Sequence, residues 1–216
     1  MILGDYSVGK TNIVRRIFNK SFDENTLTTI GIEFGTLEIN DTYDNTVLIQ
    51  LWDTCKNLII KAGAEKYKAI TTGHLRNADG IILVFDLSNE KSLISLDYWY
   101  NMISISNNKS DIKILLIGNK LDLIYEHYIS QENIENELQL IDNKISYFML
   151  NKDIFGYVKS SAKENINIQE PFIDFYHNII FSCKNDKLQR NYFNHKINRG
   201  DKVGVVNLNN KESSCC

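Results

Sequence analysis

Residues 1–18 have the sequence MILGDYSVGKTNIVRRIF, in which three apolar residues precede the octet Gly4–Thr11 and a helix-like segment follows it. The octet matches the pattern G-x-x-x-x-G-K-[ST], and its flanks predict a strand before it and a helix after it. In that context backbone N–H groups wrap a polyphosphate at a helix N-terminus, where the helix dipole also favours negative charge. The stretch therefore predicts an α/β fold around a phosphate-binding loop.

All residues of the octet are candidate nucleotide contacts: Gly4, Asp5, Tyr6, Ser7, Val8, Gly9, Lys10 and Thr11. Lys10 is expected to reach the outer phosphates, and the Thr11 hydroxyl is expected to hold Mg²⁺. The alternative is a glycine-flanked turn that arose by chance. A chance turn would not account for the strand and helix patterns on its two sides.

The composition is that of an ordinary globular protein, with 43% hydrophobic residues, 24% charged residues and a formal net charge of −3. This charge gives no reason to expect nucleic-acid binding. Cysteines 55, 183, 215 and 216 have neither a metal-binding spacing nor a disulfide framework, which favours a reducing, intracellular location. No secretory signal precedes the phosphate loop and no apolar run has the length of a membrane span. Any membrane contact is thus expected through another kind of anchor.

Apolar runs and helical patterns alternate along the rest of the chain. Strands are predicted at residues 1–3, 32–39, 46–52, 81–86, 112–118 and 154–160, the second and third of them joined by a turn at 40–45. Helices are predicted at 10–20, 91–105 and 168–182, with Pro171 in the first turn of the last. The buried face of helix 91–105 is predicted to carry Leu93, Leu96, Trp99 or Tyr100, and Ile103. The pattern predicts a mostly parallel six-stranded sheet with one antiparallel hairpin strand and helices on both faces.

Two motifs at strand ends indicate which base is bound. Asn119-Lys120-Leu121-Asp122 follows strand 112–118, and the Asp122 carboxylate can accept both N–H groups of a guanine edge, a donor pair that adenine lacks. Asn119 and Lys120 are expected to brace the loop and the base plane. Ser161-Ala162-Lys163 follows the last strand and is expected to donate a backbone N–H to the guanine oxygen. The pair of motifs favours GTP or GDP and argues against a nucleotide kinase.

Three further residues complete the predicted site. Asp53 ends strand 46–52 and is expected to bind Mg²⁺ through a water molecule. Thr29 lies in the polar loop 21–29, within expected reach of the metal and the γ-phosphate, and Phe22 is expected to cover the base. The predicted metal ligands are thus Thr11, Thr29 and Asp53.

With these motifs in this order, the chain resembles a small GTPase of the Ras superfamily, and specifically a Rab. The resemblance covers residues 1 to about 182 and rests on four stretches: Thr29–Phe34 (TIGIEF), Gln50–Thr54 (QLWDT), Glu65–Thr71 (EKYKAIT) and Leu83–Asp86 (LVFD). The segment 66–71 leans toward the recycling-endosome subgroup. The final Cys215-Cys216 resembles the Rab double-geranylgeranylation signal, and two prenyl chains anchor a protein stably where one is marginal.

The resemblance implies a Ras-like P-loop GTPase domain over residues 1–182 and a flexible, basic, hypervariable tail over residues 183–216. It also implies a switch in vesicle-mediated transport, whose loops around Thr29 and Gly63 are ordered by the γ-phosphate and Mg²⁺. Effectors, an exchange factor and a GTPase-activating protein (GAP) would bind the switch loops. The strip expected to face them is Ile32, Phe34, Trp52 and Tyr67, although these residues would also suit a core.

The family further implies a GDP-dissociation inhibitor, and a Rab escort protein with geranylgeranyl transferase, as partners of the tail. We expect a monomer in the cytoplasm and on the cytosolic face of endomembranes, vesicles or the plasma membrane, held there by Cys215 and Cys216.

The chain departs from the family pattern in four places. Residues 55–61 interrupt the second switch between Asp53 and Gly63, and we expect a lineage insertion or a translated intron piece there. Ala64 replaces the water-positioning glutamine, so hydrolysis is expected to be slow without a GAP. Only three residues precede Gly4, for which we expect a truncated gene model. Tyr6 replaces a small residue, and its ring is expected to crowd the γ-phosphate.

A second interpretation remains open beside the slow GTPase. The same substitutions suit a Rab-like module that holds guanine nucleotide with little or no hydrolysis. A nucleotide kinase is a distant third, because the motif at Asn119–Asp122 opposes it.

Overall fold

The computed structural model describes residues 1–25, 32–40, 46–54, 73–107 and 112–182 of the chain. Residues Met1–Ile179 form one compact unit. Several expected features, among them Thr29, Gly63, Ala64, Tyr67, residues 55–61 and the tail from 183 onward, lie outside the described residues.

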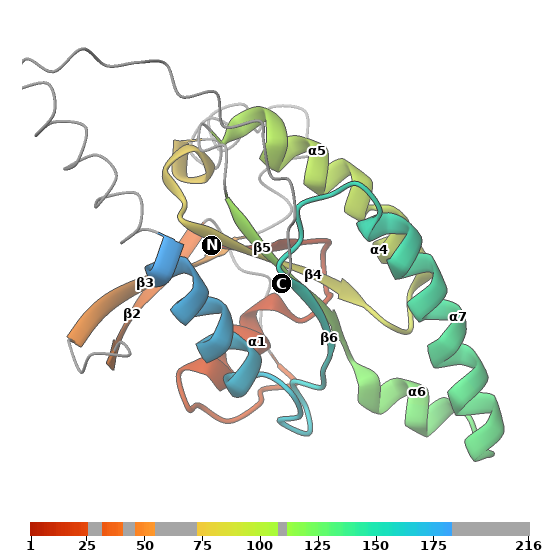
Figure 1. Ribbon diagram of the computed structural model, residues 1–216. Coiled ribbons are helices and arrows are strands. Elements are labelled where there is room, and N and C mark those ends of the chain that lie inside the picture. The colour runs from red at the N-terminus through yellow and green to blue at the C-terminus, as the bar shows by residue number, and fades with distance from the viewer. Residues whose placement is uncertain (26–31, 41–45, 55–72, 108–111, 183–216) are drawn as a thin grey trace, which may run out of the picture. The chain divides into compact units, whose positions relative to one another are not determined.

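A six-stranded sheet forms the centre of this unit (Figure 1), in the order β2-β3-β1-β4-β5-β6. Its strands are β1 (Ile2–Gly4), β2 (Ile32–Asn40), β3 (Thr46–Thr54), β4 (Gly80–Asp86), β5 (Lys113–Asn119) and β6 (Gly156–Lys159). The β2–β3 pair is antiparallel and the other four pairs are parallel. The predicted mixed sheet with one antiparallel hairpin is confirmed.

The three-residue strand β1 lies between β3 and β4, with Ile2 opposite both Asp53 and Ile82. The Met1 ammonium group donates a hydrogen bond to the Gly80 carbonyl at 2.9 Å, and Thr54 Oγ1 donates to the Ile2 carbonyl at 2.8 Å. Although β1 has only three residues, it pairs with both β3 and β4. It therefore places the following loop at the carboxyl edge of the sheet.

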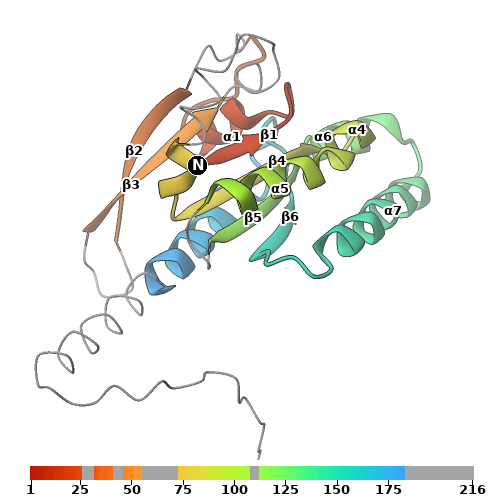
Figure 2. The ribbon, with the colours of Figure 1, turned by 90° about the horizontal axis from the view of Figure 1, so that it is seen from above.

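The described helices are α1 (Lys10–Ile17), residues 73–77, α4 (Glu90–Ile94), α5 (Leu96–Ser106), α6 (Leu121–His127), α7 (Gln131–Met149) and residues 169–182. They cover both faces of the sheet, as Figure 2 shows from above. Among the described residues no helix is both long and apolar enough to cross a membrane.

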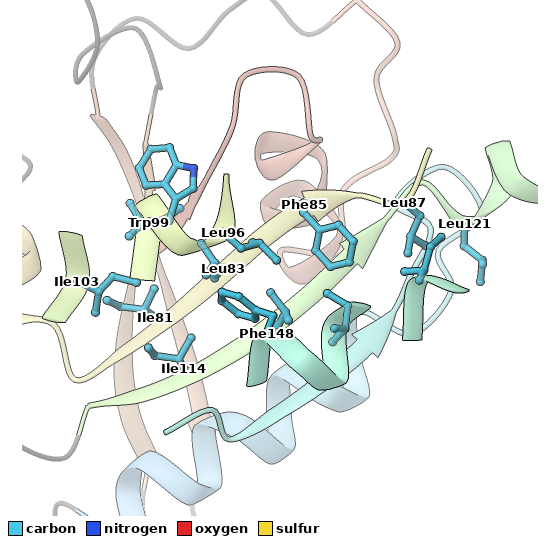
Figure 3. Close-up of a cluster of buried hydrophobic side chains, with 14 of the residues drawn as sticks. Ile81, Leu83, Phe85, Leu87, Leu96, Trp99, Ile103, Ile114, Leu121 and Phe148 are labelled. Atoms are coloured by element: carbon cyan, nitrogen blue, oxygen red, sulfur yellow. The ribbon is translucent and has the colours of Figure 1, made fainter. Parts of the chain in front are cut away.

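Side chains of β4 alternate between two cores, because successive residues of a strand point to opposite faces. Ile81, Leu83 and Phe85 pack against α5 and α7 in one cluster, part of which is drawn in Figure 3. Ile82 and Val84 pack against α1 and helix 169–182 in the other. All seven residues of β4 are buried, as predicted for a parallel strand covered on both faces.

The element boundaries differ from prediction in several places. The helix predicted to reach residue 20 ends at Ile17, because Asn19 adopts a left-handed conformation (φ 57°) and the N–H groups of Asn19 and Lys20 bond back to Arg16 and Arg15. The single helix predicted at 91–105 is divided at Ser95, whose hydroxyl bonds to the Lys91 carbonyl and to Asp5. The last strand covers only Gly156–Lys159, and residues 126–152, for which the sequence analysis named no element, contain the 19-residue helix α7.

Candidate nucleotide-binding site

The phosphate loop connects β1 to α1 at the carboxyl edge of the sheet. Its two glycines stand where a side chain would not fit: a Cβ atom on Gly4 (φ 142°) would collide with the Val84 carbonyl, and one on Gly9 (φ 95°) with the Asn119 amide. Glycine therefore stands at both ends of the motif because neighbouring atoms lie too close to the backbone for a side chain, and not because the loop must be flexible.

Lys10 is buried at 7% exposure in the first turn of α1. Its ammonium group donates to the carbonyls of Gly4 at 3.0 Å and Asp5 at 2.7 Å. The positive charge is therefore held inside the loop and adds to the positive end of the α1 dipole. This arrangement favours an anion in the loop.

The Asp5 carboxylate anchors the loop to α5. Its Oδ1 accepts from the indole N–H of Trp99 at 2.9 Å, and its Oδ2 accepts from the Ser95 hydroxyl at 2.8 Å. The neighbouring Tyr6 is 57% exposed. Trp99 was predicted only as a core residue, and it fills the core while positioning the loop as well.

Thr11 and Asp53 form a pair of oxygen ligands beside the loop. The Thr11 hydroxyl donates to Asp53 Oδ2 at 2.6 Å, and Asp53 is only 3% exposed. A hydroxyl and a carboxylate side by side suit Mg²⁺, which prefers oxygen and takes few protein ligands when phosphates supply the others. The residues present therefore fit the metal; the third predicted ligand, Thr29, lies outside the described residues.

Asn119 joins the two predicted loops. Its Nδ2 donates to the Val8 carbonyl at 2.9 Å, and its Oδ1 accepts from the backbone N–H of Ala162 at 3.0 Å. Asn119 is 1% exposed, so both hydrogen bonds are shielded from water. The phosphate loop and the segment at residue 162 are thus brought together, as the motifs predicted. The Ala162 N–H, an expected guanine donor, is engaged by Asn119 in this arrangement.

Asp122 and Lys120 are each held by a partner that orients the side chain. The Ser161 hydroxyl donates to Asp122 Oδ1, and the Lys120 ammonium lies 2.7 Å from Asp86 Oδ2. Lys120 has a left-handed backbone (φ 66°), which turns the chain into α6. Asp86 was not predicted as a site residue, although its place at the carboxyl end of a buried strand was a usable signal.

Arg16 of α1 holds the segment 161–163 from the other side. Its Nε donates to the Ala162 carbonyl and its Nη2 to the Lys163 carbonyl, both at 2.8 Å. Lys163 forms an ion pair with Glu126 at 2.8 Å, and this hydrogen bond raises the pKa of the Lys163 ammonium. Nothing in the sequence singled out Arg16, because its partners lie about 146 positions away.

Phe22 is half-buried and packs against the core cluster that contains α1. Gly63, Ala64, Cys215 and Cys216 lie outside the described residues, so their predicted roles stay predictions.

Three rings form a row at the end of the β2–β3 hairpin nearest the site. Phe34 stacks on Trp52 with ring centroids 4.8 Å apart, and Trp52 contacts His74 at 4.3 Å. Phe34 is 60% exposed, whereas Trp52 is half-buried against the core, so the strip is partly surface and partly core. His74 was not predicted as a member of the strip.

Comparisons with known proteins agree with this geometry. The model of the Ras family matches residues 1–181. The chain is 32% identical to GTP-binding protein YPTC5 of Chlamydomonas reinhardtii over 191 residues, covering 87% of this chain and 84% of that protein. It is 32% identical to Ras-related protein Rab-13 of Rattus norvegicus (83% and 78% covered) and 34% identical to human Ras-related protein Rab-3A (80% and 69% covered).

Proposed function

The chain belongs to the Ras family, as a Rab-type small GTPase, and from that premise we propose a specific function for it: a membrane-trafficking switch that binds GTP and GDP with Mg²⁺ and hydrolyses GTP slowly. The hydrogen bonds of Asn119 support this proposal most directly. They join Val8 of the phosphate loop to Ala162 in segment 161–163. One buried side chain thus connects the proposed phosphate-binding loop to the proposed guanine-binding segment.

In the proposed complex, the phosphates lie against the loop Gly4–Thr11 with Lys10 beneath them. Thr11 and Asp53 would hold Mg²⁺, directly and through water, together with Thr29; bound Mg²⁺ neutralises charge on the phosphate oxygens. Asp122, oriented by Ser161, would accept the two N–H groups of guanine. Lys120 and Phe22 would flank the base, and a guanine oxygen that accepts from Ala162 would replace Asn119 Oδ1 as acceptor.

Slow hydrolysis follows from the side chain at position 64. A glutamine orients the attacking water in relatives that hydrolyse GTP, and the methyl group of Ala64 has no hydrogen-bonding atom to do so. Tyr6, a residue of the loop itself that is 57% exposed, adds bulk where a GAP would insert a catalytic arginine. The alternative proposal is a nucleotide-binding module with little or no GTP hydrolysis. It has the same support and differs only in the rate of hydrolysis.

The exposed Phe34 ring, backed by Trp52 and His74, is the proposed docking point for effectors, exchange factor and GAP. Large aromatic rings that are half in water are frequent anchors of protein interfaces. The membrane would be reached through prenyl groups on Cys215 and Cys216, delivered by an escort protein with geranylgeranyl transferase and extracted by a GDP-dissociation inhibitor.

Two measurements on the purified chain test the proposal. The bound nucleotide is released and separated by chromatography, and hydrolysis of radiolabelled GTP is followed in a single turnover with Mg²⁺, with and without a Rab GAP. We expect GDP or GTP to co-purify and hydrolysis to be slow alone. No hydrolysis with any GAP would favour the binding module, whereas bound adenine nucleotide would contradict the guanine assignment. The matched control is Asp122→Asn, which keeps the size of the side chain but cannot accept both guanine N–H groups.

A further inference from the structure

Residues 21–23 follow α1 in the chain and are held against it by two side chains of the helix. Asn12 and Arg15 are three positions apart, so they lie on the same face of α1. Both donate hydrogen bonds to backbone carbonyls of residues 21–23. This short segment is therefore attached to the helix whose first turn carries Lys10 and Thr11 of the nucleotide site.

The side-chain amide of Asn12 pairs with both backbone groups of a single residue. Its Nδ2 donates to the Asp23 carbonyl at 3.0 Å, and its Oδ1 accepts from the Asp23 N–H at 3.1 Å. A primary amide carries donors and an acceptor side by side, so it can satisfy a peptide N–H and C=O together. Asn12 is only 7% exposed, which shields the pair from competing water. The pair therefore fixes the backbone of Asp23 relative to α1.

Arg15 holds the other end of the same segment. Its Nε donates to the Ser21 carbonyl at 2.9 Å, and its Nη2 lies 3.9 Å from the Asp23 carboxylate. Because both members of this ion pair are partly exposed, the pair itself contributes little, and the hydrogen bond to Ser21 matters more. With Ser21 and Asp23 both attached to α1, the residue between them cannot leave the helix unless one of these hydrogen bonds breaks.

The residue between them is Phe22, the side chain expected to cover the guanine base. Its ring is half-buried and packs against the core cluster that contains Ile13 and Ile17 of α1. A ring that is already held in place loses less conformational freedom when a base stacks against it, so it binds the base more tightly than a mobile ring would. The anchors on either side of Phe22 therefore bear on how firmly nucleotide is held.

We propose that Asn12 and Arg15 are positioning residues, which hold Phe22 against the base and thereby slow the release of guanine nucleotide. Release then requires residues 21–23 to open locally, and each hydrogen bond to α1 raises the free energy of that opening. Because Asn12 directly follows Thr11, one turn of α1 serves the phosphates and the metal and, through Phe22, the base. The inference rests on the proposed function, since Phe22 has this effect only when a nucleotide is bound.

The release of a fluorescent GDP analogue from the full-length protein measures the effect. Asn12→Ala loses both hydrogen bonds to Asp23 and should release the analogue about tenfold faster than the parent chain, a factor that corresponds to about 1.4 kcal/mol. Asn101→Ala, on the exposed side of α5, is the matched control and should release it at the parent rate. An unchanged release rate in Asn12→Ala would overturn the proposal.

A double-mutant cycle with Phe22→Ala separates positioning from a general loss of stability. If Asn12 acts through Phe22, then Asn12→Ala should change the release rate by less than about twofold in a chain that already carries Phe22→Ala. A tenfold acceleration in both backgrounds would show that Asn12 acts by another route, such as the helix turn that carries Thr11, and would contradict the assignment.

A second variant keeps the test open if Asn12→Ala does not fold. Arg15→Met retains an unbranched apolar side chain on a partly exposed position and lacks only the donor to the Ser21 carbonyl. It should speed release about threefold in the parent chain, by loss of one hydrogen bond at the surface, and should have no effect beside Phe22→Ala. Parent-like release in Arg15→Met would overturn its share of the proposal.

Hydrogen exchange tests the attachment of the segment without reference to nucleotide. The Asp23 N–H is bonded to Asn12 Oδ1, so NMR should show it exchanging more slowly in the parent chain than in Asn12→Ala. Equal exchange in the two proteins would overturn the proposal at its first step. A protein that binds no guanine nucleotide would contradict the proposed function instead, and exchange at Asp23 would still report whether Asn12 holds the segment.

Discussion

The side-chain amide of Asn119 donates a hydrogen bond to the backbone carbonyl of Val8 at 2.9 Å. These residues are 111 positions apart, one at the end of β5 and the other in the phosphate loop. The same side chain accepts from Ala162 at 3.0 Å. Three separate segments of the chain thus meet at one buried amide.

Replacing Asn119 with alanine should weaken guanine-nucleotide binding by about 5- to 12-fold. In the proposed complex a guanine oxygen accepts from Ala162 in place of Asn119 Oδ1, so the variant loses the one buried hydrogen bond that holds the phosphate loop, from Asn119 Nδ2 to the Val8 carbonyl, which contributes about 1–1.5 kcal/mol. Isothermal titration with GDP measures the effect. Asn101→Ala, on the exposed side of α5, is the control and should bind like the parent chain. Equal affinities of the two variants would contradict the role of Asn119.

Removing the Thr11 hydroxyl should abolish the effect of Mg²⁺ on nucleotide release. In the parent chain we expect chelation of Mg²⁺ by EDTA to accelerate GDP release, because Thr11 and Asp53 no longer share a metal with the phosphates. Thr11→Ala should release GDP quickly with or without EDTA. Thr11→Ser keeps the hydroxyl and should behave like the parent chain, and a similar loss in Thr11→Ser would point to packing instead.

Trp99→Phe should destabilise the protein and loosen the phosphate loop. The ring of phenylalanine fills most of the core space, but the indole N–H that bonds Asp5 at 2.9 Å is missing. A hydrogen bond to a charged group contributes about 1.5–3 kcal/mol, so the free energy of unfolding should fall by about 2 kcal/mol. Urea denaturation measures this fall, and GDP titration should show about tenfold weaker binding. Ser95→Ala removes the other donor to Asp5 and should weaken GDP binding in the same direction.

Ala64→Gln should accelerate hydrolysis of GTP, because the new amide can orient the attacking water. Single-turnover hydrolysis with Mg²⁺ compares this variant with the parent chain, and Ala64→Leu is the control for side-chain size. Equal rates for the parent chain and the glutamine variant would show that something other than this side chain limits the reaction.

Much of the fold could be predicted because its strands carry strong local signals. The apolar runs of β4 and β5 are buried on both faces, so these strands could be predicted without knowing which distant residues contact them. The end of α1 at Ile17 was not predicted, because an asparagine in the sequence does not by itself show that its backbone is left-handed. Asn19 adopts that conformation here. The division at Ser95 depends in part on Asp5, a residue 90 positions away.

Candidate-site residues that lie within a contiguous motif could be predicted from the sequence. Residues that act through a partner far away in the sequence could not. Lys10, Thr11, Asn119 and Asp122 lie in compact motifs, and the structure brings them to one edge of the sheet. Asp86, Arg16 and His74 act through contacts with remote residues, so their types and spacing in the sequence carried little information. Only Asp86, at the end of a buried strand, had a position that could have drawn attention to it.

The alternation of β4 between two cores restricts how this chain can change length during evolution. One residue inserted within β4 would exchange the side chains that face α5 and α7 with those that face α1, and both cores would be lost at once. Length can vary only where the register of the sheet is not involved. Residues 55–61 follow the last residue of β3, and the long segment 126–152 lies between β5 and β6. Neither segment therefore interrupts a described strand, and neither shifts the register on which the two cores depend.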